Sequence, residues 1–580
     1  MRPPHSTRAR PAPRGGGFAG EPNPLLVREL RQALRLPRLP WQISAVVALI
    51  GLGMLSIGSL EGKQGRPAQL GVGLFQGFIS ILLAYVSLMG PATAAGAIAT
   101  EREGKTLEPL LLTGLTPTDI ARGKFLAAFG TIALQVLALF PLAAIPFLFG
   151  GVTAAELIVA VAYVMIVAAV SVAFGLAVAS RTQTLRAALA ISVVLPAAAL
   201  PVVFGMMLGF GEAVSRKKWP FLQAGGPIWW ASAYTSVPFG LDYLLWLILW
   251  PLVVIGLPFW LFSAMTASNL AGANDDRSTA IKRWFVGSTL AVSVVGFLTC
   301  FRVDANSAVG AAILMQGLIA VLMLLGVTLI VGDPLSPSRL VRARWERLGA
   351  GPLRRFLGPG LLRGGALVIG CAMISLGVCF AGGVLGSSTG GLRAIVGTPS
   401  STPGASSVAS ALAIVVLYTL LFTTFLVGFA SFLRTRKASS AVPVARAWTI
   451  AFTVIALVVP WILYTILGSF DRASRENAVF AAPSPAYAYF AFERELKRYG
   501  DGSDHTIAAL GASLAWGAIG LVLLGVAWER ARRAVSVQDR IIQTTQRRLD
   551  EEAEEDEDDE AEEPKADAPP PMPGDPGDVA

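Results

Sequence analysis

Residues that commonly carry catalysis or bind metals are scarce in this sequence. Its 580 residues include only two histidines and three cysteines. His5 and His505 lie at opposite ends of the chain, and Cys300, Cys371 and Cys379 show no metal-ligand spacing. Because zinc sites and catalytic triads draw on these residue types, their scarcity argues against both. Small apolar packing is the default role of the three cysteines.

Charge is also scarce, at 15% of the chain against about 25% in soluble proteins, while apolar residues reach 54%. Apolar runs of roughly 20 residues, enough to cross a hydrocarbon core of about 30 Å, recur along the chain. They lack the alternation of barrel strands, and a backbone in lipid must satisfy its own hydrogen bonds, so we interpret them as helices. The sequence predicts an all-α polytopic membrane protein with about twelve transmembrane helices. The expected spans are 41–60, 70–93, 125–149, 155–180, 185–210, 235–262, 284–302, 307–331, 365–386, 409–433, 448–468 and 506–528.

Acidic residues are nearly absent from the middle of these runs. Glu156, Asp242 and Asp304 lie near the ends of expected spans. Carriers coupled to protons or sodium usually need ionisable groups or broken helices at mid-membrane. If the chain moves a substrate, we therefore expect the energy to come from a partner.

The positive charges indicate how the chain is oriented. With the N-terminus inside, the segments on the cytoplasmic side hold 35 of the 47 Lys and Arg residues and the outer segments hold 12. Positively charged loops are retained on the cytoplasmic side, so we expect both termini to be cytoplasmic in an integral protein of the cell membrane, the inner membrane in a bacterium. The basic charge is thus explained by membrane topology and does not indicate a nucleic-acid-binding surface. We also expect no cleavable signal peptide.

Composition divides the chain into four segments. We expect a cytoplasmic N-terminal segment (1–40), two six-helix membrane domains (41–283 and 284–528) and a cytoplasmic tail (529–580). The tail holds 12 acids among residues 550–563, followed by a Pro-rich stretch, so it is predicted to be disordered.

An amphipathic helix is expected before the first span, in NPLLVRELRQALRL. Asn23 can cap this helix, Pro24 fits the first helical position, and Arg28 and Glu29 lie in its first turns. Its leucines fall on one face opposite the arginines, which suits a membrane surface with anionic lipid. Packing against a soluble partner is the alternative.

The stretch ATEREGKT resembles a phosphate-binding loop only superficially. Such a loop uses glycines between a strand and a helix so that backbone N–H groups converge on phosphate. Here Ala99 replaces the first glycine, Glu101 and Glu103 would repel phosphate, and the preceding residues have a helical pattern. We therefore expect the chain itself to bind no ATP.

The loop between spans two and three contains residues that end one helix and start another. Pro109 prevents one uninterrupted helix through it. Thr116, Pro117 and Asp119 resemble a capping box with proline at the first helical position, so a new helix should start there and enter span three. Gly123 and Lys124 mark the expected membrane boundary.

These features resemble the permease subunits of ABC exporters of the ABC-2 type. The shared features are NPLLVREL before the first span and a Glu-Arg-Glu … Thr-Leu-Glu … Leu-Leu … Thr … Ile … Gly-Lys series between spans two and three. Family members commonly carry glycine before the Thr of that series, whereas this chain has Lys105, and Pro109 is atypical. The resemblance covers roughly residues 23–283.

The resemblance implies a permease, not an enzyme, whose loop is a coupling helix for a separate ATPase subunit. ATP and Mg²⁺ would bind in that partner, and this chain would hold no cofactor. Glu101, Arg102 and Glu108 would make polar contacts with the ATPase, and Thr116 and Pro117 would fix the helix start. Leu107, Leu111, Leu112 and Ile120 would supply apolar contacts. The full set of coupling residues is Glu101, Arg102, Thr106, Leu107, Glu108, Leu111, Leu112, Thr116, Pro117, Ile120, Gly123 and Lys124.

Several alternatives remain open from sequence. The chain could be a scaffold without transport, or a lipid- or glycan-processing enzyme, although no cluster of acids, His or Lys stands out. Residues 284–528 form either a degenerate second copy, giving a pseudo-dimer, or an accessory bundle in a homodimer of whole chains. The loop between spans eight and nine offers Trp345, Leu348, Leu353 and Phe356 as further partner contacts.

Overall fold

The structure is a computed structural model that describes residues 26–29, 31, 38–61, 67–106, 109, 116–222, 226–272, 275–395, 405–436, 442–470, 478–496 and 502–562. In these ranges every regular element is a helix, and twelve helices are long and apolar enough to cross a membrane. The predicted all-α fold and the predicted number of spans are therefore confirmed. The chain is an integral membrane protein.

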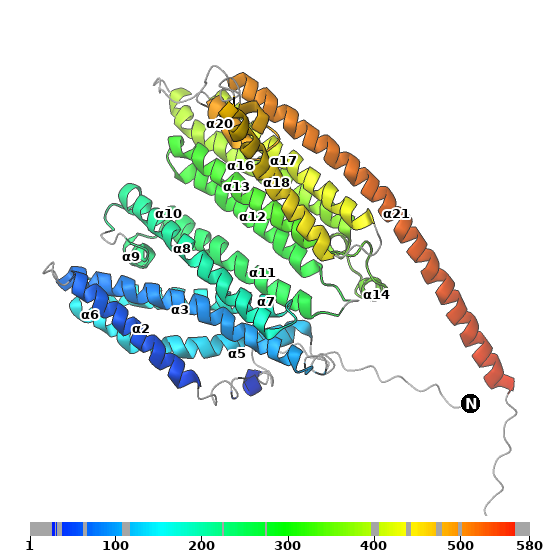
Figure 1. Ribbon diagram of the computed structural model, residues 1–580, viewed down its shortest axis with the longest axis horizontal. Coiled ribbons are helices and arrows are strands. Elements are labelled where there is room, and N and C mark those ends of the chain that lie inside the picture. Colours follow the sequence, from blue (N-terminus) through cyan, green and yellow to red (C-terminus); the bar gives the residue numbers. More distant parts are fainter. Residues whose placement is uncertain are drawn as a thin grey trace, which may run out of the picture.

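The first unit comprises spans one to six and is coloured from blue to teal in Figure 1. Its elements are α2 (Arg38–Glu61), α3 (Pro67–Glu103), α5 (Pro117–Ala138), η2 (Phe140–Ala143), α6 (Ala144–Phe149), α7 (Ala154–Ala179), α8 (Leu185–Lys217), α9 (Trp229–Ser236), α10 (Leu241–Tyr243), η3 (Leu244–Leu249), η4 (Leu252–Gly256) and α11 (Leu257–Leu270). Small residues bring α3 and α7 close: a Cβ on Gly175 would lie 2.3 Å from the Pro91 carbonyl oxygen. Ser171 also donates to the Val86 carbonyl at 2.9 Å. Close approach through small residues is the usual way in which helices associate in lipid.

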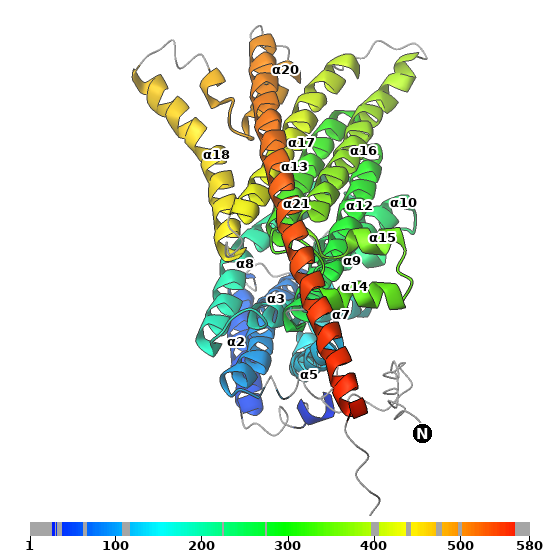
Figure 2. The ribbon, with the colours of Figure 1, turned by 90° about the vertical axis from the view of Figure 1, so that its right-hand side faces the viewer.

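The second unit comprises spans seven to twelve. Its elements are α12 (Thr279–Arg302), α13 (Ala305–Ile330), α14 (Arg339–Arg347), α15 (Pro352–Leu357), α16 (Leu361–Ile395), α17 (Ala405–Arg436), α18 (Val442–Phe470), η5 (Ala478–Ala481), α20 (Tyr487–Leu496) and α21 (Gly502–Glu562). Glycines again allow close packing, because a Cβ on Gly428 of α17 would lie 2.3 Å from the Gly520 carbonyl oxygen of α21. Figure 2 shows one end of α18 leaning away from the other helices of this unit.

The two units share a packing pattern. In both, the first span packs on the second, the second on the third, fourth and fifth, and the fourth on the third, fifth and sixth. Each unit also places a short helix between its fifth and sixth spans against its fourth span, α9 in one and α20 in the other. This recurrence supports a six-plus-six arrangement. The units meet through spans six and seven, where Trp284 Nε1 donates to the Leu257 carbonyl at 2.8 Å and Trp250 Nε1 donates to Thr299 Oγ1 at 3.1 Å.

Two expected span boundaries are wrong. The third span runs over Pro117–Ala138 and not 125–149, because Pro141 cannot continue an α-helix and the chain turns into η2 and α6. The sixth span runs over Leu241–Leu270 and not 235–262. Pro238 disfavours helix in the residue before it, so α9 ends at Ser236 as a separate short helix.

The predicted disorder of the tail is also wrong for its described part. Helix α21 continues through the acidic run to Glu562, so residues 529–562 are helical. Glutamate and arginine are good helix formers, and a segment attached to an existing helix does not have to nucleate a new one. Residues 563–580 lie outside the described residues.

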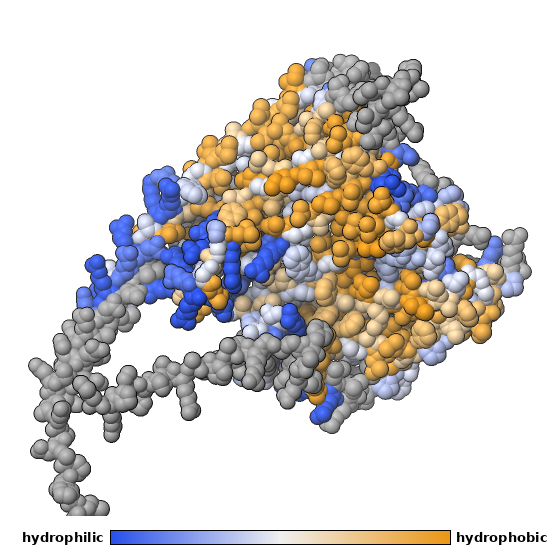
Figure 3. Space-filling view, turned by 180° about the vertical axis from the view of Figure 1, so that it is seen from behind, coloured by the Kyte–Doolittle hydropathy of each residue, from blue (hydrophilic) through white to orange (hydrophobic). Residues whose placement is uncertain are grey.

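The ends of the spans form two opposite faces. Because the spans alternate in direction and are even in number, α2 begins and α21 leaves the bundle on the same face. We call this the loop face, because it carries residues 101–106 and 116–124. Figure 3 shows hydrophobic residues over most of one side of the molecule, with many hydrophilic residues gathered at the left of the view. The sequence predicts that the loop face is cytoplasmic.

Candidate functional site

Helix α3 ends within the EREGKT stretch in a defined helix-termination motif. Thr106 N donates to the Glu101 carbonyl at 2.9 Å, and Lys105 N donates to the Arg102 carbonyl at 3.2 Å. Lys105 has φ 54°, the only positive φ among described residues other than glycine. These two bonds around a left-handed residue define a Schellman motif, in which glycine is usual at the position of Lys105. The commoner family glycine therefore has a structural reason, and the stretch is the carboxyl end of a helix.

Helix α5 begins as the sequence predicts. Thr116 is the N-cap, its hydroxyl oxygen accepts from Asp119 N at 3.2 Å, and Pro117 occupies the first turn. The Thr116 hydroxyl also donates to Asp119 Oδ2 at 2.6 Å. The cap satisfies a backbone N–H that the first helical turn leaves unpaired. Each end of the loop is therefore fixed by local hydrogen bonds.

Arg102 connects the end of α3 to the end of α7. Its guanidinium donates to the Ser180 carbonyl at 2.9 Å, to the Ala179 carbonyl at 3.3 Å and to the Thr182 carbonyl. The last carbonyls of a helix have no partner within it and carry partial negative charge, so a cation there is favourable. Asn269 of α11 donates to Ser180 Oγ at 2.9 Å and joins the sixth span to the same point.

Glu103 connects the same turn to the start of α8. One of its carboxylate oxygens accepts from Leu185 N at 2.6 Å, which satisfies a backbone N–H in the first turn of that helix. A carboxylate at this end of a helix is also favoured by the helix dipole. Adjacent residues of α3 thus hold the end of span four and the start of span five.

Lys124 lies at the centre of a buried charge cluster. Its side chain has 0% exposure, and its Nζ lies 2.8 Å from Glu101 Oε2 and 3.5 Å from Glu29 Oε1. The ammonium also donates to the Ala97 carbonyl at 2.9 Å. Arg28 lies 3.3 Å from the other Glu101 oxygen. The cluster joins the segment before the first span to spans two and three.

The described part of the predicted interfacial helix agrees with a helix, since residues 26–29 and 31 are helical. Arg28 and Glu29 meet Glu101 and Lys124, which sequence reasoning did not identify because no local pattern links positions so far apart. Asn23 and Pro24 lie outside the described residues, so the predicted cap stays a prediction.

The structure places the predicted coupling residues in three groups. Arg102 and Glu101 face inward as described above, whereas Thr106 and Thr116 are exposed and Pro117 is partly exposed. Leu107, Glu108, Leu111 and Leu112 lie outside the described residues.

Ile120, Gly123 and Lys124 form the third group, and all three are buried in the chain's own core. Ile120 has 0% exposure, so the expectation that it contacts an ATPase is wrong. Ile120 lies on the face of α5 that packs against neighbouring helices. Hydropathy alone does not distinguish such a face from one that contacts a partner protein.

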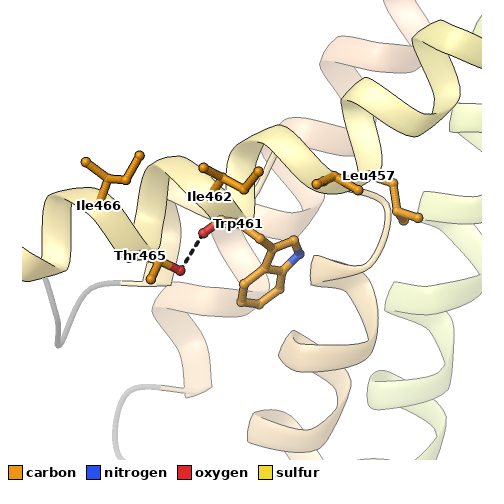
Figure 4. A pocket seen from close by; sticks show the side chains of 6 residues that line it. Leu457, Trp461, Ile462, Thr465 and Ile466 are labelled. Atoms are coloured by element: carbon orange, nitrogen blue, oxygen red, sulfur yellow. Dashed lines mark hydrogen bonds between the residues drawn. The ribbon is translucent and has the colours of Figure 1, made fainter.

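A separate hollow of about 430 Å³ lies along α18 and is shown in Figure 4. Its lining is Leu457, Val458, Trp461, Ile462, Thr465 and Ile466. The only hydroxyl in this lining, on Thr465, donates to the Trp461 carbonyl of its own helix at 2.8 Å. The hollow therefore presents apolar groups and no reactive side chain. Within the described ranges, no group of three or more His, Cys, Asp or Glu side chains is placed to hold a metal ion.

A comparison with protein families gives a match to part of the chain. Residues 62–241 match the model of the ABC-2 family transporter proteins. No curated protein matches the chain. The matched range begins just before α3 and ends at the start of span six, so it contains the whole loop and the helices that Arg102 and Glu103 hold. The chain is an integral membrane protein, and residues 62–241 of its first unit are similar to the ABC-2 family of transporter proteins.

Proposed function

We propose that this chain is the membrane-spanning permease subunit of an ATP-binding cassette exporter. A separate ATPase subunit docks on the loop of residues 100–124 and supplies the energy for transport. ATP and Mg²⁺ bind in that partner, and the loop face is cytoplasmic. The family match and the twelve apolar helices support this function at the level of a transporter permease.

The link between the loop and the spans is the observation that carries the proposal. Arg102 donates to carbonyls at the end of span four, and Glu103 accepts from the first helical residue of span five. A displacement of the loop by an ATPase therefore acts directly on two further spans. Lys124 and Glu101 hold the loop to span three through a buried ion pair.

The described loop residues that are exposed to a partner are Thr100, the turn at Glu103–Thr106, Pro109, Thr116, Thr118 and Arg122. Leu107, Leu111 and Leu112 lie between the end of α3 and the start of α5 in the sequence. We propose that they supply the apolar contacts with the ATPase. Burial of apolar anchors usually dominates the affinity of an interface, so we expect L111A and L112A to weaken ATPase association more than K105A.

Nucleotide binding by this chain is not part of the proposal. At a phosphate site the backbone N–H groups at the amino end of a helix point toward the ligand. In EREGKT the helix instead ends, and the last carbonyls of α3 carry partial negative charge. We expect the purified chain to bind no ATP. Tight ATP binding that K105A abolishes would overturn this assignment.

The loop between spans eight and nine is built differently and lacks the Glu-Arg-Glu series. Trp345, expected from sequence as a partner contact, is 8% exposed and packs on Gly358. A second ATPase would therefore find Trp345 covered, with Phe356, 39% exposed, as the one accessible aromatic side chain of this described loop. We propose one ATPase surface per chain, so that two chains pair to engage two ATPases.

Arg102→Lys tests the coupling role, with Arg283→Lys, outside the docking loop, as the matched control. Lysine keeps the charge but cannot bond several carbonyls with a planar fork. In the full complex in lipid, we expect the affinity of the R102K chain for the ATPase to stay within about twofold of the parent's. Permease-dependent ATP hydrolysis should fall by about tenfold, which is equivalent to ~1.4 kcal/mol. Arg283 is exposed on α12, outside the loop, and its lysine variant should change neither the ATPase affinity nor the rate of hydrolysis. Unchanged hydrolysis with R102K would contradict the coupling role, and failure of the chain to copurify with any ATPase would favour a scaffold.

A further inference from the structure

The second unit carries a strongly basic surface on the loop face. We call residues 339–357, which comprise α14, the following turn and α15, the arginine platform. It has six arginines and one acid, Glu346. Five of the arginines are exposed, and Arg342 is partly exposed and lies 3.4 Å from Asp539 of α21. The platform arginines are Arg339, Arg342, Arg344, Arg347, Arg354 and Arg355.

The platform is anchored to the bundle from beneath. The Ser338 hydroxyl oxygen accepts from Val341 N at 3.3 Å and caps α14. Val341, Trp345 and Ala350 form a small buried cluster, and Trp345 lies against Gly358, where an added Cβ would be 2.2 Å from its ring. Because one side of α14 is buried in this way, the arginines on its other sides are held at fixed places.

A buried ion pair fixes the ends of the platform. Lys282 Nζ, on a side chain 1% exposed, lies 2.5 Å from Asp333 Oδ2, just after α13. The same ammonium donates to the Gly358 carbonyl at 2.8 Å, just before α16. The platform therefore begins and ends where spans eight and nine reach the loop face.

Exposed apolar side chains are interleaved with the arginines. Leu340, Leu348 and Leu353 are 53%, 56% and 72% exposed. Leu340, Arg344 and Arg347 are spaced i, i+4 and i+7, so they share one stripe of α14. Figure 1 shows α14 nearly end-on while the spans run across the picture, and Figure 2 shows it lengthwise. Helix α14 thus lies across the span axes, as a helix in the plane of a membrane surface does.

We propose that the arginine platform binds the anionic phospholipid headgroups of the leaflet at the loop face. Guanidinium groups bond phosphate oxygens in pairs, and exposed leucines at the level of the span ends can enter the boundary between headgroups and acyl chains. An ATPase is the less favoured occupant, because the platform buries its one tryptophan and presents charge of almost one sign. The surface anchors the second unit to the membrane and is independent of the coupling loop.

The experiment uses the full chain with its three cysteines replaced and a bimane probe on Ala343→Cys, an exposed position of α14. In neutral detergent micelles, brominated phosphatidylglycerol or brominated phosphatidylcholine is titrated and quenching of the probe is measured. We expect brominated phosphatidylglycerol to quench the bimane probe at a much lower mole fraction than brominated phosphatidylcholine does. Each basic residue near an anionic surface contributes about fivefold, so R344Q/R347Q should raise the phosphatidylglycerol midpoint by about 25-fold.

Two controls separate charge from folding and location. R344K/R347K keeps both charges and should stay within about threefold of the parent, because lysine retains the attraction to an anionic surface. R122Q/R186Q removes two exposed arginines from the loop face of the first unit and should leave the midpoint unchanged. Equal quenching by the two lipids, or no shift with R344Q/R347Q, would overturn the proposal. Loss of ATPase affinity with R344Q/R347Q at an unchanged lipid midpoint would assign the platform to the ATPase instead.

Discussion

Replacing Glu101 by glutamine removes the nearest carboxylate from a lysine that has no access to solvent. Lys124 Nζ lies 2.8 Å from Glu101, and its remaining neighbours are the Ala97 carbonyl at 2.9 Å and Glu29 at 3.5 Å. Removing one partner of a buried ion pair costs about 3–5 kcal/mol, because the other charge stays buried. Since Glu29 still offers a carboxylate, we expect E101Q to lower the free energy of unfolding by about 3 kcal/mol, the lower end of that range.

Lys124→Met should cost less than E101Q. The carboxylates that it leaves behind, Glu101 and Glu29, are 13% and 18% exposed, and both remain beside Arg28. We expect K124M to lower the free energy of unfolding by about 1–2 kcal/mol. The loss is small because both carboxylates keep access to solvent and a neighbouring cation. In the double variant no buried cation remains, so E101Q should add little to the effect of K124M.

The assay is reversible unfolding of the purified chain in mixed micelles, followed by circular dichroism, for the two single variants and the double variant. The double variant should be more stable than the sum of the single losses predicts, by at least about 1.5 kcal/mol. Arg122→Gln, an exposed change on the same helix, should stay within about 0.5 kcal/mol of the parent. Losses that add to within about 0.5 kcal/mol would refute the buried ion pair as the origin of the effect.

Three further predictions follow from the structure. K105G should raise the free energy of unfolding by about 1 kcal/mol, because glycine adopts the φ of 54° without strain, and a loss of stability in the same assay would contradict the Schellman motif. In a cysteine-free background, Glu493→Cys should react with an impermeant thiol reagent from outside and Arg347→Cys only after permeabilisation; the reverse pattern would invert the topology. Native mass measurement of the complex should find two chains with two ATPases, whereas one chain with two ATPases would support a pseudo-dimer.

Local sequence signals predicted the start of α5, at the second end of the loop, correctly. The capping residues Thr116, Pro117 and Asp119 act over three positions, so their pattern contains the information needed to place the start of α5. The number of spans was also predictable, because each is one continuous apolar run. The boundaries of the spans were less predictable near Pro141 and Pro238, because the apolar run continues past each of these prolines whereas the helix does not.

Contacts between distant positions were not predictable from the same signals. Arg102 meets carbonyls 77 to 80 positions away, and Lys124 meets Glu29 from before the first span. Periodicity indicates that a face is apolar or charged, but not which helix covers it. The resemblance to the ABC-2 type implied that Ile120 contacts a partner, although its own chain buries it completely.

The Glu-Arg-Glu series has a clear internal use in this structure. Glu101 pairs with Lys124, Arg102 bonds the end of α7, and Glu103 bonds the start of α8. Side chains of Glu101 and Arg102 that are occupied within the chain are poorly placed to bind a partner as well. On the proposed function, docking on the ATPase would fall to the residues that follow Glu103, and the series would carry their displacement to spans three, four and five. A variant of Arg102 should therefore separate coupling from docking, whereas a variant of Leu111 or Leu112 should impair both.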